Sequence, residues 1–272
     1  MTPALSRARA FHRLHNSGCF VIPNPWDLGS ARLLVQLGFR ALATTSSGLA
    51  WSLGRRDHAV PLETALVHFR TMAAEVPVPV SADFEQGFAA EPSAVAANCS
   101  AAAATGIAGL SIEDSTGDPS APLYDLPLAV DRIHAARQAI DDSGTGVLLT
   151  ARSEGFLVGR LDSRETLRRL TAYAEAGADC LYAPGLRAMP EIAALVRAVA
   201  PKPINVLVGG DFATVAALAD AGVRRISVGG ALARAAWTAF LAAAEEIATH
   251  GTFSHLGAIV PFGEIDDRFV AG

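Results

Sequence analysis

Short apolar and β-branched runs alternate with longer stretches rich in Ala and Leu, and the alternation continues almost to the end of the chain. Such runs favour strands buried on both faces of a parallel sheet, and the stretches between them favour crossover helices. We expect strands over residues 19–23, 40–44, 78–82, 108–112, 146–151, 180–183, 204–208 and 224–228. Eight such βα units predict a (β/α)₈ TIM barrel, a single-domain fold of about 250 residues.

The helical stretches support the same architecture. They cover residues 29–37, 62–75, 93–105, 126–142, 163–176, 190–200 and 212–221, and an Ala-rich segment at 231–249 gives the eighth helix. Several stop at a glycine just before the next strand, as helix C-termini commonly do: Gly38, Gly106, Gly177 and Gly222. We therefore expect a catalytic barrel domain over residues 1–250. A C-terminal helical arm over 251–272 is expected to pack on a neighbouring subunit.

Charge and cysteine content restrict the kinds of partner. The 272 residues include 22 basic and 27 acidic ones, and this net charge of −5 argues against nucleic acid or a membrane surface as a partner. Cys19, Cys99 and Cys180 are odd in number and widely spaced, which favours reduced thiols over a disulfide framework. Residues 1–14 lack an apolar signal region and no run is long enough to span a bilayer, so we expect a cytoplasmic protein.

Lys202 is the only lysine, and it stands in Pro201-Lys202-Pro203 just before a predicted strand. In a parallel barrel this position belongs to the end of the strands that contributes to stability, opposite the end that carries the chemistry. A Schiff-base aldolase needs its lysine at the catalytic end, so the sequence argues against that class of enzyme.

Chemically capable side chains collect where the predicted strands end, which is the catalytic face of α/β barrels. Asp83 and Glu85 follow the third strand and Glu113 follows the fourth. Asp83 and Glu85 are two residues apart, so in an extended segment they point the same way. Oxygen-only donors suit Mg²⁺ or Mn²⁺ rather than Zn²⁺, because no His or Cys cluster occurs at these ends. The long connections at 45–61 and 115–127 are expected to be binding loops or lids.

Several polar residues at these ends also have a structural interpretation. Asp27 and Asp114 could cap a helix or hydrogen-bond a loop. Arg152 could pair with Glu154 or Glu113 in a structural network. The convergence of all these residues on one rim of the barrel is what favours a functional site.

Six segments, spread over most of the chain, carry a recognisable order and spacing. They are Asn24-Pro25-Trp26-Asp27-Leu28-Gly29-Ser30-Ala31-Arg32, Ser46-Ser47-Gly48-Leu49, Gly54-Arg55-Arg56-Asp57, Ser81-Ala82-Asp83-Phe84-Glu85-Gln86-Gly87-Phe88, Gly109-Leu110-Ser111-Ile112-Glu113-Asp114 and Ala151-Arg152-Ser153-Glu154-Gly155-Phe156. Together they resemble the isocitrate lyase/phosphoenolpyruvate mutase superfamily. That superfamily contains (β/α)₈ barrels that form dimers or tetramers, often with an exchanged C-terminal helix.

The resemblance implies a metal site. Asp83 corresponds to the direct ligand, and Glu85 and Glu113 correspond to residues that hold metal-bound waters. The implied cofactor is Mg²⁺, with Mn²⁺ as the alternative. The metal would chelate the 2-oxo group and a carboxylate oxygen of the substrate. As a Lewis acid, it would stabilise the enolate left when a C–C bond breaks.

The resemblance also implies how the substrate is held. Arg152 matches an arginine that pairs with substrate oxygens through its planar fork, and Asp57 matches an aspartate beside the reacting centre. Residues 46–48 match a segment that binds the substrate carboxylate. The expected substrate-binding residues are Trp26, Ser46, Ser47, Gly48, Arg152 and Asn205. The expected catalytic residues are Asp57, Arg152 and Tyr124.

Departures from the family pattern concern proton transfer. Isocitrate and methylisocitrate lyases carry a Lys-x-Cys-Gly-His loop after the fourth strand, whereas residues 115–122 of this chain contain no Lys, Cys or His. The Lys and Asn of phosphonate-handling members are absent from this segment too. After the sixth strand, Gly185 stands where methylisocitrate lyases have a glutamate. The chain is therefore most similar to the phosphoenolpyruvate-mutase-like branch that lacks the lyase loop.

The first functional hypothesis is a Mg²⁺-dependent lyase that cleaves a C–C bond of a small 2-oxo or 2-hydroxy di- or tricarboxylate. Decarboxylation of an oxaloacetate-like acid needs the least extra machinery, because CO₂ leaves without a general base. Tyr124, Asp57 or His58 would then protonate the enolate. A related alternative is a mutase or hydrolase acting on the P–C bond of a phosphonopyruvate-like substrate, with Asp57 as the nucleophile.

Two other classes remain as rivals. The glycine pairs Gly209-Gly210 and Gly229-Gly230 follow the last two strands, where many barrels bind phosphate. They would anchor a phosphorylated substrate of an isomerase or synthase, or they make tight turns into the next helices. The other rival is a protein that binds Mg²⁺ and 2-oxo acids without turnover.

Overall fold

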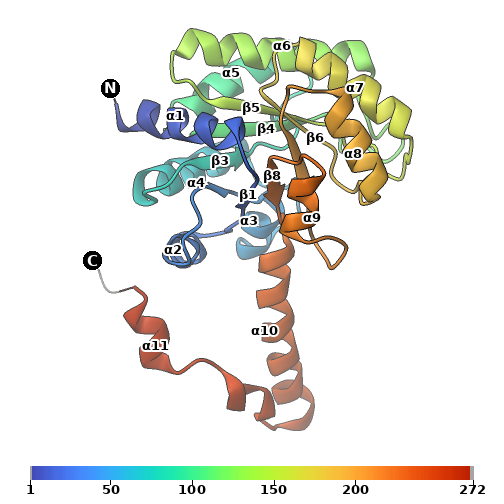
Figure 1. Ribbon diagram of the computed structural model, residues 1–272. Helices are drawn as coiled ribbons and strands as arrows, with labels where there is room; N and C mark the ends of the chain where they lie inside the picture. The colour runs from blue at the N-terminus through green and yellow to red at the C-terminus, as the bar shows by residue number, and fades with distance from the viewer. Residues whose placement is uncertain (1, 270–272) are drawn as a thin grey trace.

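The computed structural model describes residues 2–269, and within them eight parallel strands form one barrel (Figure 1). The strands are β1 Phe20–Ile22, β2 Leu42–Ala43, β3 Val80–Asp83, β4 Gly109–Glu113, β5 Leu148–Arg152, β6 Cys180–Tyr182, β7 Ile204–Leu207 and β8 Arg225–Ser227. The sheet order β1-β8-β7-β6-β5-β4-β3-β2 brings the first strand beside the last. Between β1 and β2, the N–H of Ala43 donates to the carbonyl of Pro23 at 3.1 Å. The predicted (β/α)₈ barrel is confirmed.

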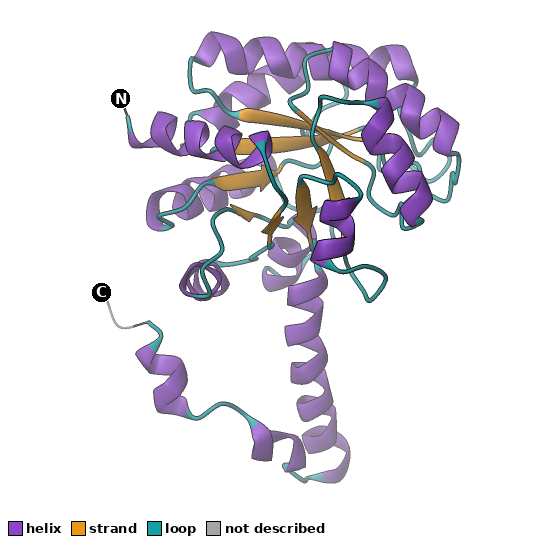
Figure 2. Cartoon of the chain, in the orientation of Figure 1, coloured by secondary structure: helices purple, strands orange, loops and turns teal. Residues whose placement is uncertain are grey.

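All eight predicted helices are present; seven of them surround the strands, and the eighth, α10, projects away from them (Figure 2). They are α2 Leu28–Gln36, α4 Leu62–Glu75, α5 Pro92–Ala103, α6 Leu126–Ser143, α7 Ser163–Glu175, α8 Met189–Ala198, α9 Val215–Asp220 and α10 Ala231–His250. Their ends differ from the predicted ones by a few residues at most. The largest difference is in α9, where the Thr214 side chain accepts a hydrogen bond from the N–H of Ala217 and starts the helix there.

One helix precedes the barrel and was not predicted. Helix α1 spans Pro3–Asn16, with Thr2 as its N-cap. Its residues Ala8, Phe11 and Leu14 are buried, and Phe11 packs in a cluster with residues from the N-terminal ends of the strands. A Cβ added at Gly109 of β4 would lie 2.6 Å from Cε1 of Phe11, so only glycine fits opposite this ring. Helix α1 therefore closes the N-terminal end of the barrel.

The connection over residues 45–61, which we expected to be a binding loop or lid, contains a helix in its first half. Helix α3 occupies Ser46–Ser52, and the side chain of Thr45 caps it. Gly48, Leu49 and Ala50 of this helix are buried, so packing fixes the segment against the barrel. The second long connection is a loop as expected, and an antiparallel bridge between Ser115 and Leu123 holds its two sides together.

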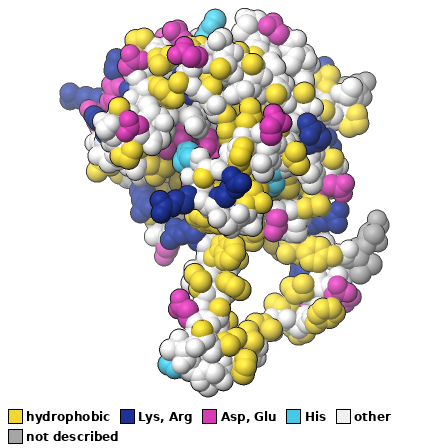
Figure 3. Space-filling model, turned by 180° about the vertical axis from the view of Figure 1, so that it is seen from behind, with side chains coloured by type: hydrophobic (Ala, Val, Ile, Leu, Met, Phe, Trp, Pro, Cys, Tyr) yellow, Lys and Arg dark blue, Asp and Glu magenta, His cyan; other side chains and the backbone are white. Residues whose placement is uncertain are grey.

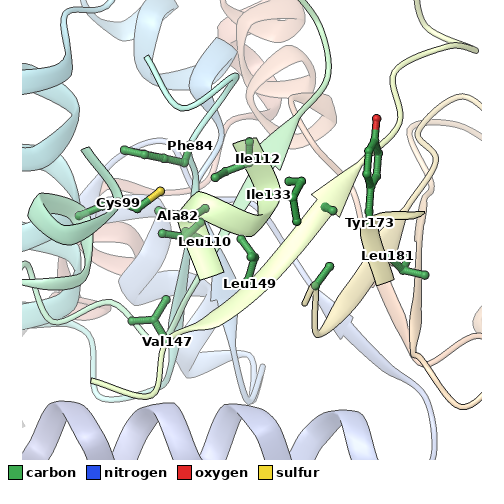
Figure 4. Close-up of a cluster of buried hydrophobic side chains, with 14 of the residues drawn as sticks. Ala82, Phe84, Cys99, Leu110, Ile112, Ile133, Val147, Leu149, Tyr173 and Leu181 are labelled. Carbon is green, nitrogen blue, oxygen red and sulfur yellow. The ribbon is translucent and has the colours of Figure 1, made fainter. Parts of the chain in front are cut away.

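The main hydrophobic core lies between the strands and the surrounding helices (Figure 4). On β4, Leu110 and Ile112 point outward into this core, whereas Ser111 between them lines the cavity inside the barrel. The alternation follows from the pleat of a strand, which sends successive side chains to opposite faces. The outer face therefore stabilises the fold, and the inner face is available for polar residues.

Three predictions about the chain as a whole can be compared with the structure. Lys202 lies before β7, and its Nζ donates to the carbonyl of Ala178 at 2.6 Å, so it stands at the end of the barrel opposite the predicted site. Cys19, Cys99 and Cys180 are all free thiols. Among the described residues, no helix has both the length and the apolarity that crossing a membrane requires.

The C-terminal arm extends away from the barrel. Helix α10 projects outward, and a 3₁₀ turn at Ser254–Ala258 and helix α11 at Phe262–Asp267 follow it (Figures 1 and 2). Apolar side chains are exposed along α10 and along the segment that follows it, as the yellow atoms of Figure 3 show. Phe262 has 85% of its surface exposed, and Gln36 of α2 donates a hydrogen bond to the carbonyl of Arg268. Residues 1 and 270–272 of the predicted domain and arm lie outside the described residues.

Candidate active site

A polar cavity opens at the carboxyl ends of the strands. Its volume is about 200 Å³, and its wall contains residues from β1 to β8. Several residues that we expected in the site line it: Ser46, Ser47, Asp57, Asp83, Arg152 and Asn205. The side chains come from loops and strands far apart in the sequence, and the closed barrel brings them together.

Arg152, the last residue of β5, lies at the centre of a cluster of carboxylates. Its Nη1 lies 2.7 Å from Oδ1 of Asp83, its Nη2 lies 3.2 Å from Oε2 of Glu113, and its Nε lies 2.9 Å from Oε1 of Glu154. The ladder between β4 and β5 places Glu113 directly opposite Arg152. Burial alone would lower the pKa of Arg152, but the three carboxylates raise it well above its usual range. The guanidinium is therefore a permanent cation.

Asp83 connects this cluster to the loop after β2. Its Oδ2 accepts a hydrogen bond from the N–H of Ser46 at 3.0 Å, and its own N–H donates to Oγ1 of Thr44 at 2.9 Å. The hydroxyls of Thr45 and Ser47 lie 3.0 Å apart in the same loop. Each carboxylate oxygen has two acceptor positions, so Asp83 keeps capacity for a further ligand.

Glu85 reaches the cluster by a different path from the one we expected. Strand β3 ends at Asp83, and Glu85 has a φ of 47°, so the two-residue repeat of an extended strand does not apply. His58 also has a left-handed backbone, with a φ of 62°. Its Nδ1 lies 3.2 Å from Oε2 of Glu85, and its Nε2 lies 4.0 Å from Oε1 of Glu113. Such strained conformations occur often at functional sites.

Negative charge is concentrated here. Burial raises the pKa of Glu113 to about 8, although Arg152 opposes the shift. Burial likewise raises the pKa of Glu85 and Glu154. The hydrogen bond to Glu85 is the main cause that raises the pKa of His58 to about 9. The cluster therefore contains more buried carboxylate than its two cations neutralise.

An oxygen-rich, acidic donor set of this kind fits Mg²⁺. Within residues 2–269, no group of three His, Cys, Asp or Glu side chains is arranged to ligate one ion directly. Mg²⁺ usually keeps several waters and contacts only one or two protein carboxylates, so it does not need three direct ligands. The chemistry of the donors thus agrees with the metal that the sequence predicts.

Two expected substrate-binding residues shape the site instead of lining its cavity. A Cβ at Gly48 would lie 2.7 Å from both Cγ2 of Thr45 and Cβ of Trp26, so Gly48 allows helix α3 to approach the segment after β1 closely. The N–H of Gly48 points to Oγ1 of Thr45 at 3.4 Å. Trp26 and Gly48 therefore position Ser46 and Ser47, and neither of them contributes to the wall of the cavity.

Tyr124 lies outside the cavity. It lines a separate pocket between the loops that follow β4 and β5, and its ring stacks under Arg132 at 4.1 Å. The structure therefore does not bring Tyr124 together with Asp57 and Arg152, as our catalytic assignment had supposed. The reason is local: Tyr124 stands one residue before the N-cap of α6, and the chain directs its ring toward that helix.

Asp27 and Asp114 have the structural roles that we considered for them. Asp27 caps α2, with its Oδ1 at 2.7 Å from the N–H of Ser30. Asp114 accepts hydrogen bonds from the N–H of Glu154 at 2.8 Å and from the hydroxyl of Tyr173 at 2.6 Å. It also pairs with Arg169 at 3.0 Å.

Gly229-Gly230 forms a turn before α10, and Gly209-Gly210 lies in the loop before α9. The N–H groups of Val228 and Gly229 both donate to Oδ1 of Asn24, at 2.9 and 2.8 Å, so they are already satisfied. The cavity wall includes Gly229 and Gly230 but neither glycine of the 209–210 pair. This geometry favours the tight-turn interpretation over a phosphate site.

Several residues of the cavity or cluster were not predicted as site residues, and four of them carry large polar side chains. They are Asn24, Glu154, Tyr182 and Arg225. Glu154 follows Arg152 by two residues, a spacing that we had interpreted only as structural pairing. Arg225 and Tyr182 lie within predicted strands, where an isolated polar residue gives no signal of the direction in which it points.

Buried carboxylates and an arginine at the carboxyl ends of parallel barrel strands occupy the position where α/β-barrel enzymes have their active sites. A family model described as phosphoenolpyruvate phosphomutase matches residues 11–248, and the chain belongs to this family. The superfamily includes lyases and mutases, and its members typically use Mg²⁺.

Individual relatives cover nearly the whole chain. A crystal structure of a protein from Burkholderia cenocepacia, assigned provisionally as a lyase or mutase, is 47% identical, has a TM-score of 0.96 and covers 99% of this chain and 98% of its own. An uncharacterised protein of Mycobacterium tuberculosis is 34% identical over 264 residues, 96% of each chain. An oxaloacetate decarboxylase of Paraburkholderia xenovorans is 29% identical over 209 residues, 72% of this chain and 67% of its own.

Proposed function

We propose that this protein is a Mg²⁺-dependent lyase that cleaves a C–C bond of a small 2-oxo or 2-hydroxy di- or tricarboxylate. The observation that carries the proposal is the cluster of Asp83, Glu113 and Glu154 around Arg152, which borders a polar cavity of about 200 Å³. A site of this size and polarity suits a small charged acid. Membership of a family of lyases and mutases supports the same class of reaction.

In this proposal Asp83 holds the metal directly, and Glu85 and Glu113 hold it through water. Bound there, Mg²⁺ would supply Lewis-acid stabilisation for negative charge that develops on a substrate oxygen. The excess of buried carboxylate supports this assignment, because burial raises the pKa of Glu113 to about 8 and a divalent cation would offset that cost.

Arg152, Ser46 and Ser47 orient the substrate in this account. The fork of Arg152 suits a carboxylate, and a substrate oxygen would take the Nη2 hydrogen that now faces Glu113 at 3.2 Å. The hydroxyls of Ser46 and Ser47 line the same wall and can donate to a second substrate oxygen. These contacts fix the bond that breaks relative to the acidic cluster.

Asp57 is the residue that we propose for proton transfer. Of the three candidates Tyr124, Asp57 and His58, only Asp57 lines the cavity among the described residues. It would protonate the carbanion carbon after CO₂ or a carbonyl fragment leaves. His58 next to it hydrogen-bonds Glu85 and would keep the carboxylates in place.

The proposal is tested by release of pyruvate from oxaloacetate, and by cleavage of longer 2-oxo and 2-hydroxy diacids, in the presence of Mg²⁺. We expect turnover by the wild type and a loss of at least 100-fold in kcat for Asp57→Asn, in line with the usual contribution of a general acid. If the wild type binds these acids but converts none of them, the result would favour the alternative of a non-catalytic binding protein. Turnover of phosphonopyruvate alone would favour the P–C alternative, in which Asp57 is the nucleophile.

We also propose that the C-terminal arm packs on a neighbouring subunit and that the protein is a homo-oligomer. The exposed apolar side chains along the arm support this. Phe253, Ile259 and Phe262 have 62%, 64% and 85% of their surface exposed. A continuous apolar surface of this kind is typical of protein–protein contact.

A further inference from the structure

A second arginine lies deeper in the barrel, below the carboxylate cluster. Arg225 is the first residue of β8, and it lines the cavity together with Ser227, whereas Ile226 between them belongs to the outer core. Only 5% of its surface is exposed. One pleat repeat, about 7 Å, separates Arg225 from Ser227 along the strand, so Arg225 stands on the floor of the cavity.

Every hydrogen-bond partner of this guanidinium is neutral. Its Nε donates to Oδ1 of Asn205 at 2.9 Å, and its Nη2 donates to Oγ1 of Thr150 at 3.0 Å. Its Nη1 lies 3.3 Å from Nε2 of His15. Nδ1 of His15 lies 2.8 Å from the carbonyl of Phe11, which can only accept, so Nδ1 carries the hydrogen and Nε2 accepts from Arg225.

The charge of Arg225 is therefore not compensated by protein. Among the described residues, no Asp or Glu forms an ion pair with it, whereas Arg152 faces three carboxylates. Burial, followed by the charge of Arg225, lowers the pKa of His15 to about 3, so the imidazole adds no positive charge of its own. A buried charge without a partner destabilises the folded state by several kcal/mol. A purely structural role therefore does not account well for an arginine at this position.

We propose that Arg225, with Asn205 and Ser227, binds the second carboxylate of a dicarboxylate substrate at the floor of the cavity. The inference rests on the proposed function, in which the first carboxylate and the 2-oxo or 2-hydroxy group lie near Asp83 and Arg152. The two ends of the cavity then have opposite character: an acidic mouth suited to a cation and a cationic floor suited to an anion. A substrate that contacts both must be elongated, which selects diacids over monocarboxylates of the pyruvate type.

The two terminal nitrogens of Arg225 leave room for this contact. Each carries two hydrogens, and one hydrogen on each is used by His15 or Thr150. The remaining hydrogens are available to a carboxylate, the anion whose two oxygens match the planar guanidinium. The amide of Asn205 donates to Oγ of Ser227 at 2.9 Å, and the serine hydroxyl donates to the hydroxyl of Tyr182 at 3.4 Å, a long hydrogen bond that a carboxylate acceptor at this position would replace.

The experiment compares two ligands that differ by one carboxylate. Malate and lactate are titrated calorimetrically into the wild type, Arg225→Met and Asn205→Asp, with Mg²⁺ and again with EDTA. We expect the wild type to prefer malate and Arg225→Met to lose at least tenfold in malate affinity, with lactate and oxalate unchanged. Asn205→Asp keeps the volume and gives Arg225 an ion-pair partner, so it should remove the preference as well.

Controls separate this proposal from its alternatives. Arg224→Gln removes the neighbouring cation, which lies on the outside and donates to the carbonyl of Gly18, and it should behave as the wild type. An equal loss of affinity for malate, lactate and oxalate in Arg225→Met and Asn205→Asp would show that Arg225 has only a structural role, and it would overturn the inference. Oxalate that fails to bind the wild type with Mg²⁺ would contradict the proposed function instead. The malate preference in EDTA would still test Arg225, because its contact needs no metal.

Discussion

Glu113 and Arg152 lie directly opposite each other in the ladder of β4 and β5, and Oε2 of Glu113 is 3.2 Å from Nη2 of Arg152. The register fixes this pair, because a slip of one residue in either strand would turn that strand's charged side chain to the outer, apolar face of the barrel. The same alternation that buries Leu110 and Ile112 outside thus delivers a carboxylate and a guanidinium to the site.

Arg152→Met should lower the free energy of unfolding by about 3–5 kcal/mol, because it leaves the buried carboxylates of Glu113 and Glu154 without their cation. Urea denaturation in EDTA measures this difference. Arg168→Met is the matched control: Arg168 pairs with Glu165 on the exposed surface of α7, and its loss should have little effect. Equal stabilities for Arg152→Met and the wild type would contradict the charge balance described for the cluster.

Stability should decrease as the pH falls below 6.5, and His15 should account for part of the decrease. Burial and Arg225 lower the pKa of folded His15 to about 3, so between pH 6.5 and 3 the unfolded chain binds the proton and the folded chain does not. This contribution is on the order of 3 kcal/mol at pH 4. His15→Gln, which can still bond Phe11 and Arg225, should show a smaller decrease from pH 7 to pH 4 in denaturation experiments. If the stability of His15→Gln decreased from pH 7 to pH 4 as much as that of the wild type, the result would argue against a neutral His15.

Gly48→Ala should weaken substrate binding with only a modest loss of stability. The new Cβ would lie 2.7 Å from Thr45 and Trp26, so helix α3 must shift and carry Ser46 and Ser47 with it. We expect at least a tenfold loss of oxalate affinity in calorimetric titration. Gly209→Ala is the control, since no atom lies within 4 Å of the Cβ position there. Unchanged affinity in Gly48→Ala would show that the position of α3 is not critical.

The arm should control the oligomeric state. A double variant, Phe262→Ser with Ile265→Ser, removes two exposed apolar side chains of α11 and should shift the protein from dimer or tetramer toward monomer in light scattering. Leu161→Ser is the control, because Leu161 is 73% exposed on a loop of the barrel. A monomeric wild type, or a double variant that keeps the wild-type mass, would contradict the assignment of the arm to subunit contact.

The barrel could be predicted from the sequence because each βα unit is a local signal, repeated eight times in one order. Helix α1 was missed because its pattern of Ala8, Phe11 and Leu14 is short and lies among Arg and His residues. Helix α3 was missed because Ser46-Ser47-Gly48 gives little helical signal by itself. Its formation depends on the Thr45 cap and on burial of Leu49 and Ala50.

The candidate site was predictable from the sequence only in part. Asp83, Glu113 and Arg152 stand at strand ends, where direction follows from the fold, and they meet as expected. Glu85 joins them through a left-handed turn that no strand pattern reveals. Arg225 could not be assigned, because a single charged residue within an apolar strand does not show whether it faces inward. The role that we propose for it depends on the absence of a carboxylate around it among residues 2–269, which only three-dimensional contacts show.

The central claim is that Asp83 and the neighbouring glutamates form a metal-dependent site for 2-oxo acids. Calorimetric titration of oxalate into the wild type, with Mg²⁺ and then with EDTA, tests it most directly. Asp83→Ala serves as the site variant, and Asp179→Asn, which pairs with Arg137 at the opposite end of the barrel, is the control. We predict binding by the wild type and Asp179→Asn only with Mg²⁺, and none by Asp83→Ala. Binding that is indifferent to EDTA or to Asp83→Ala, or no binding at all, would contradict the account.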